Sequence, residues 1–411
     1  MRLMIASLFA LGLAACSETE DAEKTSYADQ APDSATVRVA SFNMSLYRDA
    51  PGALLADLRD PGNAQLAALT EIVQRVRPDI LLINEFDHDA TGESLRLLRE
   101  AWLAEGRNGA APIAYPHAFT APSNTGLPTG FDLDRDGVTD GPGDAQGFGR
   151  FEGQYGMAVL SRHPIDSEEI RTFQTFLWTD MPGALLPDDP ETAAPADWYS
   201  ADMLAVLRLS SKSHWDLPIE IDGQTLHLLA SHPTPPAFDG PEDRNGRRNH
   251  DEIRFWADYL RPETSAYIHD DAGARGGLAP GARFVIAGDL NADPNDGDQA
   301  AAIAQLLEHP LIDAGLVPEA RGGQEQAALQ GGVNAAHRTP PRQDSADFND
   351  DPPSVGNLRL DYVLPSHAGL EPLRAGIFWP ASDDPLDRLV GSYPFASSDH
   401  RLVWIDLRLT M

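Results

Sequence analysis

The sequence predicts a layered α/β body built from short buried strands, covering helices and long loops. A wholly apolar run at 80–83 is typical of a strand that is covered on both faces. Leucine and valine recur at helical spacing between Leu66 and Val76, and Pro78 ends that helix. No segment repeats with a period of roughly 20–50 residues, which argues against solenoids and propellers.

The remaining elements follow in order along the chain. Residues 36–42 alternate and predict the first strand, and residues 253–260 predict a second helix. Further strands are expected at 157–160, 203–209, 226–230, 284–287, 360–364 and 402–407. Long loops rich in Pro, Gly, Asp and Asn lie at 108–153, 178–200, 232–250 and 318–357, and such loops are usually functional or insertions. No linker divides the body, so we expect one domain over 36–411 with insertions near 108–153, 178–200 and 318–357.

Charge and cysteine content exclude several classes of protein. Among 411 residues, 63 are acidic and 31 basic, which gives a net charge of −32, and the single cysteine is Cys16. One cysteine cannot form a disulfide framework or a zinc site of several thiolates. The negative charge disfavours duplex nucleic acid as a partner without excluding it. Plain solubility or a salty habitat would explain the acidic excess equally well.

The N-terminus has the features of an export signal. Arg2 precedes an apolar run at 3–13 that is too short to span a bilayer, and Leu-Ala-Ala-Cys16 follows the run. This ending resembles a bacterial lipobox, in which the peptide is cut before the cysteine and the thiol is acylated. We therefore expect a signal peptide at 1–15, a flexible acidic tether at 16–35, and a lipid on Cys16 that holds the exported protein on a membrane. Ser17 fits sorting to the outer membrane; the alternative is an ordinary cleaved signal peptide with an incidental cysteine.

Polar residues stand at the ends of the predicted strands, where ligands bind in such sheets. They are carboxylates, amides and imidazoles: Asn43, Glu85, His232, Asp289, Asn291, Asp361, Asp399 and His400. A single Asn or Asp at such a place is usually a turn former, but a whole set of these types is harder to attribute to turns. Oxygen and imidazole ligands without a thiolate suit Mg²⁺, Mn²⁺ or Ca²⁺.

The order of these motifs resembles a known family. The motifs are SFN at 41–43, NE at 84–85, YGMAVLS at 155–161, SHP at 231–233, GDLN at 288–291, LDYV at 360–363 and SDH at 398–400. Together they resemble the endonuclease/exonuclease/phosphatase superfamily of deoxyribonuclease-like phosphoesterases, over about 37–409. The resemblance implies an α/β (α+β) four-layer sandwich, with two packed mixed β-sheets flanked by helices. It also implies a hydrolase of phosphate esters (a phosphodiesterase, phosphatase or nuclease) that depends on Mg²⁺, with Mn²⁺ as the alternative.

The resemblance assigns the metal site and the attacking water. Glu85 is implied as the main metal ligand, with Asn43 beside it. Asp399 would ligate the metal or hold His400. Asp289 would position or deprotonate the water that attacks phosphorus.

The resemblance assigns the remaining residues to the phosphate group. Asn291 would donate a hydrogen bond to it, and His232 would contact it or act as general acid. Asp361 would orient His232, because a carboxylate beside an imidazole favours the protonated donor. His400 would act as base or as a donor to the phosphoryl oxygens. Which histidine is the acid and which is the base stays open.

A second acidic pattern lies in the first long loop. Carboxylates occupy positions 1, 3, 5 and 9 of a loop that resembles an EF-hand calcium loop: Asp132, Asp134, Asp136 and Asp140. Gly137 stands at position 6 as required, but position 12 is Gly143 instead of a carboxylate. The loop therefore predicts either a Ca²⁺-stabilised insertion or a plain acidic loop.

Two classes of function follow from these patterns. The first is a membrane-tethered phosphoesterase that acts on nucleic acid, a small phosphoester or a phospholipid head group. The second is a non-catalytic surface-binding lipoprotein on the same fold. A degenerate member of the second class would be expected to lose Glu85, Asp289 or His400, and this chain keeps all three. The oligomeric state and the number of metal ions stay open.

Overall fold

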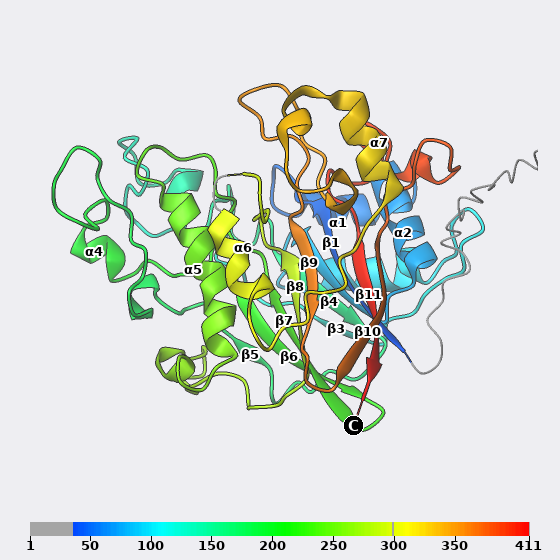
Figure 1. The fold of residues 1–411 in the computed structure, drawn as a ribbon, viewed down its shortest axis with the longest axis horizontal. Coiled ribbons are helices and arrows are strands. Elements are labelled where there is room, and N and C mark those ends of the chain that lie inside the picture. Colours follow the sequence, from blue (N-terminus) through cyan, green and yellow to red (C-terminus); the bar gives the residue numbers. More distant parts are fainter. Residues whose placement is uncertain (1–35, 298–299, 411) are drawn as a thin grey trace, which may run out of the picture.

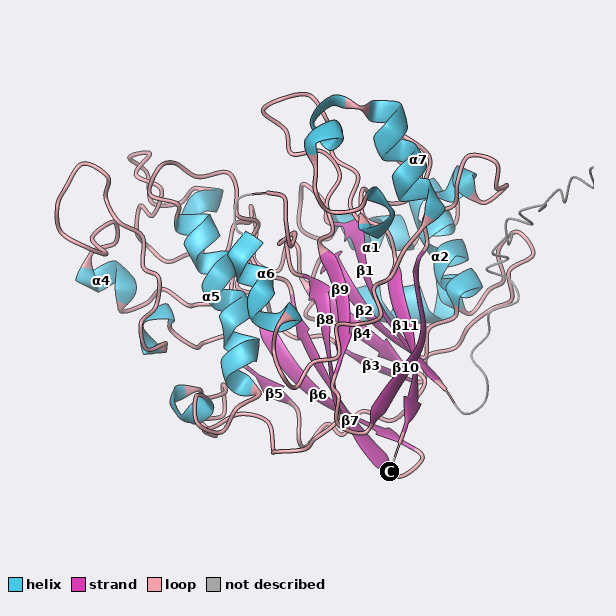
Figure 2. Ribbon diagram, viewed as in Figure 1, coloured by secondary structure: helices cyan, strands magenta, loops and turns pink. Residues whose placement is uncertain are grey.

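Two β-sheets packed face to face form the centre of the molecule, as a computed structural model shows for residues 36–297 and 300–410 (Figure 1). Helices cover the outer face of each sheet (Figure 2). The expected four-layer α/β sandwich is confirmed. Cys16, the expected signal peptide and the expected tether lie outside the described residues.

The first sheet has six strands in the order β10-β11-β1-β2-β4-β3. β1 (Val37–Leu46) runs parallel to β2 (Ile80–Phe86) and antiparallel to β11 (Val403–Leu409). The outer strands are β3 (His117–Phe119), β4 (Met157–Ser161) and β10 (Leu370–Ile377). The pairing register of β1 and β2 shifts after Asn43, at a bulge that re-aims the chain.

The second sheet has five strands in the order β5-β6-β7-β8-β9. They are β5 (Arg171–Thr172), β6 (His214–Ile221), β7 (Gln224–Ser231), β8 (Phe284–Asp289) and β9 (Asp361–Pro365). β7 and β8 are parallel, and β9 returns antiparallel to β8. The sheet is therefore mixed, like the first one.

The apolar strands are buried on both faces, as their sequences predict. In β7, Leu228 and Ala230 belong to the core between the sheets, whereas Leu229 packs into the outer core beneath the helices. Side chains of a strand alternate between its two faces, so a strand covered on both sides must be apolar throughout.

Each sheet has its own helical layer. The first sheet is covered by α1 (Ala53–Leu58), α2 (Ala64–Val76) and α3 (Glu93–Leu97), which continues into a π-helical turn at Leu98–Leu103. α2 begins at the cap Asn63, whose side chain accepts a hydrogen bond from Leu66 N, and it ends before Pro78. α5 (Arg244–Tyr259) and α6 (Ala300–Leu307) cover the second sheet.

Three sequence expectations are wrong in detail. Residues 203–209 form no strand: α4 (Ala201–Leu204) begins at Ser200, whose hydroxyl accepts from Met203 N, and a turn follows. The apolar pattern there reflects the burial of Leu207 and Leu209 in a loop. The loop at 318–357 contains α7 (Arg321–Gln330), and α5 begins inside the expected loop at 232–250.

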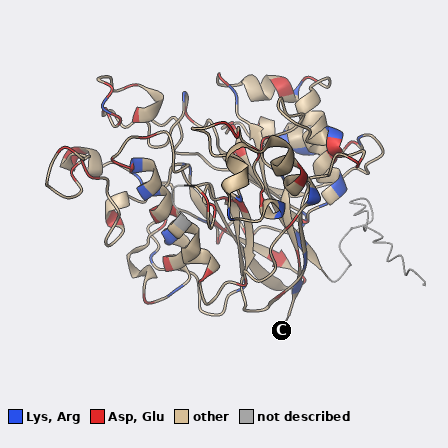
Figure 3. Cartoon of the chain, turned by 45° about the horizontal axis from the view of Figure 1, so that its top comes forward, with Lys and Arg blue, Asp and Glu red and all other residues tan. Residues whose placement is uncertain are grey.

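The acidic residues of the described part are spread over the molecule and do not form one cluster. In the view of Figure 3, acidic positions are spread over loops and helices, with basic positions between them. None of the helices in the described part of the chain is both long and apolar enough to cross a bilayer.

Candidate active site at the strand ends

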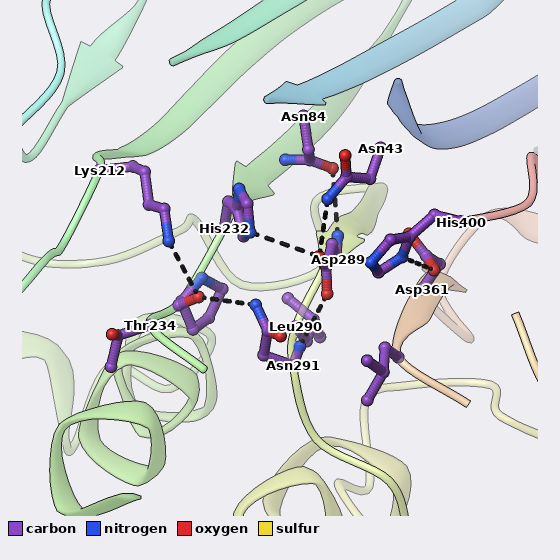
Figure 4. A network of polar contacts seen from close by, with 12 residues as sticks. Asn43, Asn84, Lys212, His232, Thr234, Asp289, Leu290, Asn291, Asp361 and His400 are labelled. Carbon is purple, nitrogen blue, oxygen red and sulfur yellow. Dashed lines mark hydrogen bonds and ion pairs between the residues drawn. The ribbon is translucent and has the colours of Figure 1, made fainter. Parts of the chain in front are cut away.

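The predicted residues meet at one edge of the two packed sheets. β1 and β2 end at this edge in parallel, as do β7 and β8 of the other sheet. β9 and β11 begin there because each runs antiparallel to its neighbour. The chain therefore delivers side chains from six strand ends to one place (Figure 4).

Asp289, the last residue of β8, lies at the centre of the site and is 1% exposed. Its Oδ2 accepts a hydrogen bond from Asn43 Nδ2 at 3.1 Å and lies 3.3 Å from His232 Nε2 and 3.6 Å from His400 Nε2. Burial alone would raise the pKa of Asp289, but His400 and His232 hold it well below its usual value. Asp289 is therefore a carboxylate with three polar neighbours aimed at one oxygen.

Two neighbouring groups fix Asp289 in this position. The Asp289 amide donates to Asn84 Oδ1 at 3.1 Å, which links β8 to β2 of the other sheet. Position 288, just before Asp289, accepts only glycine, because a Cβ on Gly288 would lie 2.1 Å from Ser231 O. The sequence alone gives no sign of either contact.

His400 is paired with Asp361. His400 Nδ1 lies 2.8 Å from Asp361 Oδ2, and both residues are buried. Burial opposes protonation, but Asp361 and Asp289 raise the pKa of His400 well above its usual value. Burial in turn raises the pKa of Asp361 to about 6. His400 is thus held as a proton donor whose Nε2 faces Asp289.

The expected pairing of Asp361 with His232 is wrong. Asp361 lies opposite Asp289 in the β8–β9 pair and reaches the histidine that precedes β11 instead. His232 Nδ1 has no partner among the described residues, and its Nε2 faces Asp289. Burial, helped by Lys212, lowers the pKa of His232 to about 4. The two histidines therefore carry different charges at neutral pH.

The expected metal ligands Asn43, Glu85 and Asp399 lie close to Asp289 and His400. Burial and the nearby charge of Asp399 raise the pKa of Glu85 to about 7, whereas the neighbouring Asn43 side chain opposes this rise. Asp399 Oδ1 accepts from Ser45 Oγ at 2.7 Å. A cation bound between these two carboxylates would offset their mutual repulsion.

The donor set fits a divalent cation. Asp289, Asp361 and His400 offer ligand atoms that all lie within 4.8 Å of one another, and Asp361 Oδ1 is buried with no hydrogen-bond partner in the described part. Oxygen-rich sets of this kind suit hard cations such as Mg²⁺, Mn²⁺ or Ca²⁺. Glu85 and Asp399 add two further carboxylates beside this cluster.

Strained backbone conformations occur at three positions in or beside the site, as they do at several loop positions elsewhere. Glu85, Asn291 and Ser45 have positive φ angles of 57°, 51° and 47°, in the left-handed region that non-glycine residues rarely adopt. Residues in such conformations cluster at functional sites. Asn291 is held there by its amide, which donates to Asp289 Oδ1 at 3.0 Å, and by its Nδ2, which donates to Pro233 O at 3.1 Å.

Lys212 also lies at the site, although no sequence motif pointed to it. It precedes β6 and extends toward His232, and its Nζ donates to Pro233 O at 3.4 Å (Figure 4). Burial lowers the pKa of Lys212, whereas Glu252, Glu85 and Asp289 oppose this shift. A signal was present in the sequence, because lysine occurs only at positions 24 and 212.

The acidic loop has a different geometry. Asp132, Asp134 and Asp136 lie close enough together to hold a cation. Asp140 follows in the exposed part of the loop, and Asp144 is buried. Asp144 Oδ1 accepts from Leu133 N at 2.8 Å and its Oδ2 from Gly141 N at 2.9 Å. Calcium binding by this loop stays a prediction.

Comparison with known proteins agrees with this geometry. Residues 40–400 match the model of the Endonuclease/Exonuclease/phosphatase family. The chain belongs to this family. Such membership supports a hydrolase of phosphate esters. A comparison with curated proteins gave no match.

Several solved structures are similar to the chain. An endonuclease/exonuclease/phosphatase from Beutenbergia cavernae is 19% identical, with a TM-score of 0.48 over 91% of this chain and 72% of that one. A family protein from Leptotrichia buccalis is 13% identical, with a TM-score of 0.44 over 91% and 100% of the two chains. Sphingomyelinase C from Streptomyces griseocarneus is 15% identical, with a TM-score of 0.46 over 90% and 99%. At these identities and TM-scores, the likenesses carry no conclusion about the substrate or the reaction.

Proposed function

We propose that this protein is a divalent-metal-dependent hydrolase of phosphate esters that uses Mg²⁺ and is exported and tethered to a membrane through an acylated Cys16. The observation that carries the catalytic part is the position of Asp289, whose Oδ2 lies between Asn43, His232 and His400. The family match supports the same reaction class. The sequence of the N-terminus alone supports export and tethering.

The charges of the site divide the work of hydrolysis between its residues. Asp289 is ionised, so it can accept a hydrogen bond from water and orient it for attack on phosphorus. It is a weak base with its lowered pKa. That suffices, because phosphoryl transfer passes through a loose transition state in which little proton removal is needed. Positioning of the water is the main task of this carboxylate.

The two histidines and Asn291 act on the phosphoryl oxygens. His400, which Asp361 keeps protonated, donates to an oxygen on which negative charge accumulates. His232 is neutral and can donate through one nitrogen only. The Asn291 amide adds a donor of fixed orientation, since Asp289 and Pro233 both hold it.

Glu85, Asn43 and Asp399 would hold the cation, with Asp289 beside them. When bound, a divalent cation supplies positive charge that stabilises the phosphoryl oxygens and the leaving oxygen. Its charge would also keep the Glu85 carboxylate ionised at neutral pH, although burial and Asp399 raise its pKa to about 7 in the protein alone.

Small phosphoesters are the substrates we favour over long duplexes. The net charge of −32 repels a polyanion at long range, and acidic positions lie among the basic ones in the view of Figure 3. Salt and Mg²⁺ screen this repulsion, so DNA and RNA belong in the assay.

The decisive experiment is a substrate panel with the full chain purified in detergent. A phosphomonoester, a bis-ester, plasmid DNA, RNA and sphingomyelin would each be tested with Mg²⁺, Mn²⁺, Ca²⁺ or EDTA. We expect hydrolysis of at least one substrate with Mg²⁺ and none with EDTA. Glu85→Gln and His400→Ala should each lower the rate by a factor of about 100 or more.

Glu71→Gln is the matched control for Glu85→Gln. Glu71 is also a buried glutamate, but it lies on α2 and forms ion pairs with Arg75 and Arg388. Its replacement should lower the melting temperature and leave kcat unchanged. Full activity in both site variants would exclude the mechanism, and inactivity of the native protein on every substrate would favour a binding lipoprotein.

The tether has its own test. Mass spectrometry of the mature N-terminus from a bacterial membrane fraction should show a chain that starts at Cys16 with added acyl mass. A mature chain with an unmodified cysteine would refute the anchor and leave the hydrolase untouched.

A further inference from the structure

We propose that Lys212 is a substrate-binding residue whose ammonium group, together with the Asn291 amide, binds a non-bridging oxygen of the scissile phosphate. This inference rests on the proposed function, which it deepens by naming a phosphate ligand outside the expected metal ligands. Neither the family motifs nor the strand-end pattern contains this residue.

Lys212 is a buried cation without an ion pair. The residue is 7% exposed, and among the described residues it forms no ion pair with a carboxylate. Its Nζ has one hydrogen bond in the described part, at 3.4 Å to Pro233 O, although an ammonium carries three donors. Burying an ammonium with unused donors is costly, so a functional reason is required.

The Pro233 carbonyl oxygen accepts hydrogen bonds from two side chains of the site. Lys212 Nζ reaches it from the segment before β6, and Asn291 Nδ2 reaches it from the loop after β8, at 3.1 Å. Both side chains lie beside His232, as Figure 4 shows. An anionic oxygen placed between them would satisfy the same donors with a full charge instead of a carbonyl dipole.

A purely structural role for Lys212 is less satisfactory. The negative charge that most strongly opposes the lowering of the Lys212 pKa is that of Glu252, which is buried in α5. Glu252 already accepts hydrogen bonds from Ser211 N at 2.6 Å, Ser211 Oγ at 3.0 Å and Thr234 N at 2.7 Å. These bonds fix the two segments that carry Lys212 and Pro233, and they need no donor from the ammonium group.

Charges of both signs meet in the site. Glu85 and Asp399 supply negative charge, where a cation fits. Lys212, His232 and Asn291 supply donors around the same centre, and Glu85 lies close enough to Lys212 to oppose the lowering of its pKa. A phosphate bound there would meet the cation with some oxygens and the Lys212 ammonium with another.

Lysine content makes a direct measurement feasible. Lysine labelled with ¹³C at Cε would give two signals, from Lys24 and Lys212, and a Lys24→Met variant assigns them. We expect inorganic phosphate to shift the Lys212 signal in a saturable manner and to leave the Lys24 signal in place. An unmoved Lys212 signal, at phosphate concentrations that inhibit hydrolysis competitively, would overturn the proposal.

Kinetics provides the second measurement. Lys212→Met keeps the length of the side chain and removes its charge. It should raise the inhibition constant of phosphate, and the KM of the substrate, by about 10-fold to 100-fold. Lys212→Arg should recover part of this loss, whereas Lys24→Met should change nothing. A normal inhibition constant in a folded Lys212→Met variant would refute the role.

The two proposals fail in different ways. A phosphate-dependent shift of the Lys212 signal in a protein without activity would support the anion site and exclude the hydrolase. Hydrolysis with competitive phosphate inhibition, but without any shift, would exclude Lys212 as a ligand and support the hydrolase.

Discussion

Two groups of acidic residues in this protein look alike in the sequence and differ in the structure. Asp289 and Asp361 come from neighbouring strands, are at most 2% exposed, and lie against His400. Asp132, Asp134 and Asp136 lie within one loop, where the first two are half-buried and Asp136 is exposed, and they have no histidine among them.

The difference lies in how the negative charge is compensated. In the loop, Asp132 accepts from the amides of Asp136 and Gly137 at 3.1 and 3.0 Å, and water can solvate the rest. Buried carboxylates have no such access to water, so they require a cation, a proton or a histidine. Burial of like charges together therefore marks the first group as functional, whereas the loop needs no ligand to be stable.

The largest expected effect separates the two groups by activity. Asp289→Asn removes the charge that orients water and should lower kcat/KM by a factor of about 1000 or more. Asp136→Asn in the loop should change kcat/KM by less than about twofold, because exposed polar substitutions have small effects. Both rates would be measured with Mg²⁺ on the best substrate of the panel. Similar losses in the two variants would contradict the comparison.

The next effect concerns pH. In the native protein Asp361 helps to hold the pKa of His400 well above its usual value, so the protonated donor persists at alkaline pH. Asp361→Asn keeps a hydrogen-bond partner but removes this charge, and burial then lowers the His400 pKa. The alkaline limb of the kcat/KM profile should move to lower pH, with a loss of about 10-fold to 100-fold near pH 8. An unmoved alkaline limb would exclude His400 as the protonated donor.

Metal removal sharpens the comparison further. EDTA should abolish activity, and Mg²⁺ bound by Glu85, Asn43 and Asp399 beside the buried group should restore it. Ca²⁺ should raise the melting temperature by about 2–5 °C if the loop binds it, because a ligand of the native state stabilises that state. Asp136→Ala should remove this rise without changing the response of activity to Mg²⁺. Calorimetric titration with the same heat in native and variant protein would identify a plain acidic loop.

The smallest effect tests how the loop is held without a cation. Asp144→Asn keeps one acceptor and loses the other, so one of the amides of Leu133 and Gly141 loses its partner. We expect the free energy of unfolding to fall by about 1–2 kcal/mol, as measured in urea. Activity should stay within about twofold of the native value. A loss of activity without a loss of stability would connect the loop to the site.

Polar residues at the ends of predicted strands account for most of the site. Asn43, Glu85, Asp289 and Asp361 follow or begin apolar runs that are recognisable without any structure. The sequence does not predict β6: Trp215, Leu217 and Ile219 alternate as in a strand, but proline at 218 argues against a strand inside a sheet. Because β6 was not among the expected strands, the strand-end pattern did not include Lys212, which lies just before it.

The sequence does not predict which residues that are far apart in the chain form pairs. Either histidine could have faced Asp361, since His232 directly follows β7 and His400 comes shortly before β11. The choice depends on the antiparallel return of β9 beside β8 and on the path of the chain before β11. The same holds for Asn84, which reaches the amide of Asp289 across the two sheets.

The sequence by itself determined the layered architecture, the set of chemical groups and their places at strand ends. These follow from local periodicity and from residue types that serve one chemistry. Only the tertiary structure decided which histidine is protonated, which acidic group is buried and that Lys212 faces the site. Protonation and ligand binding depend on distance and desolvation, and both arise only when the two sheets pack together.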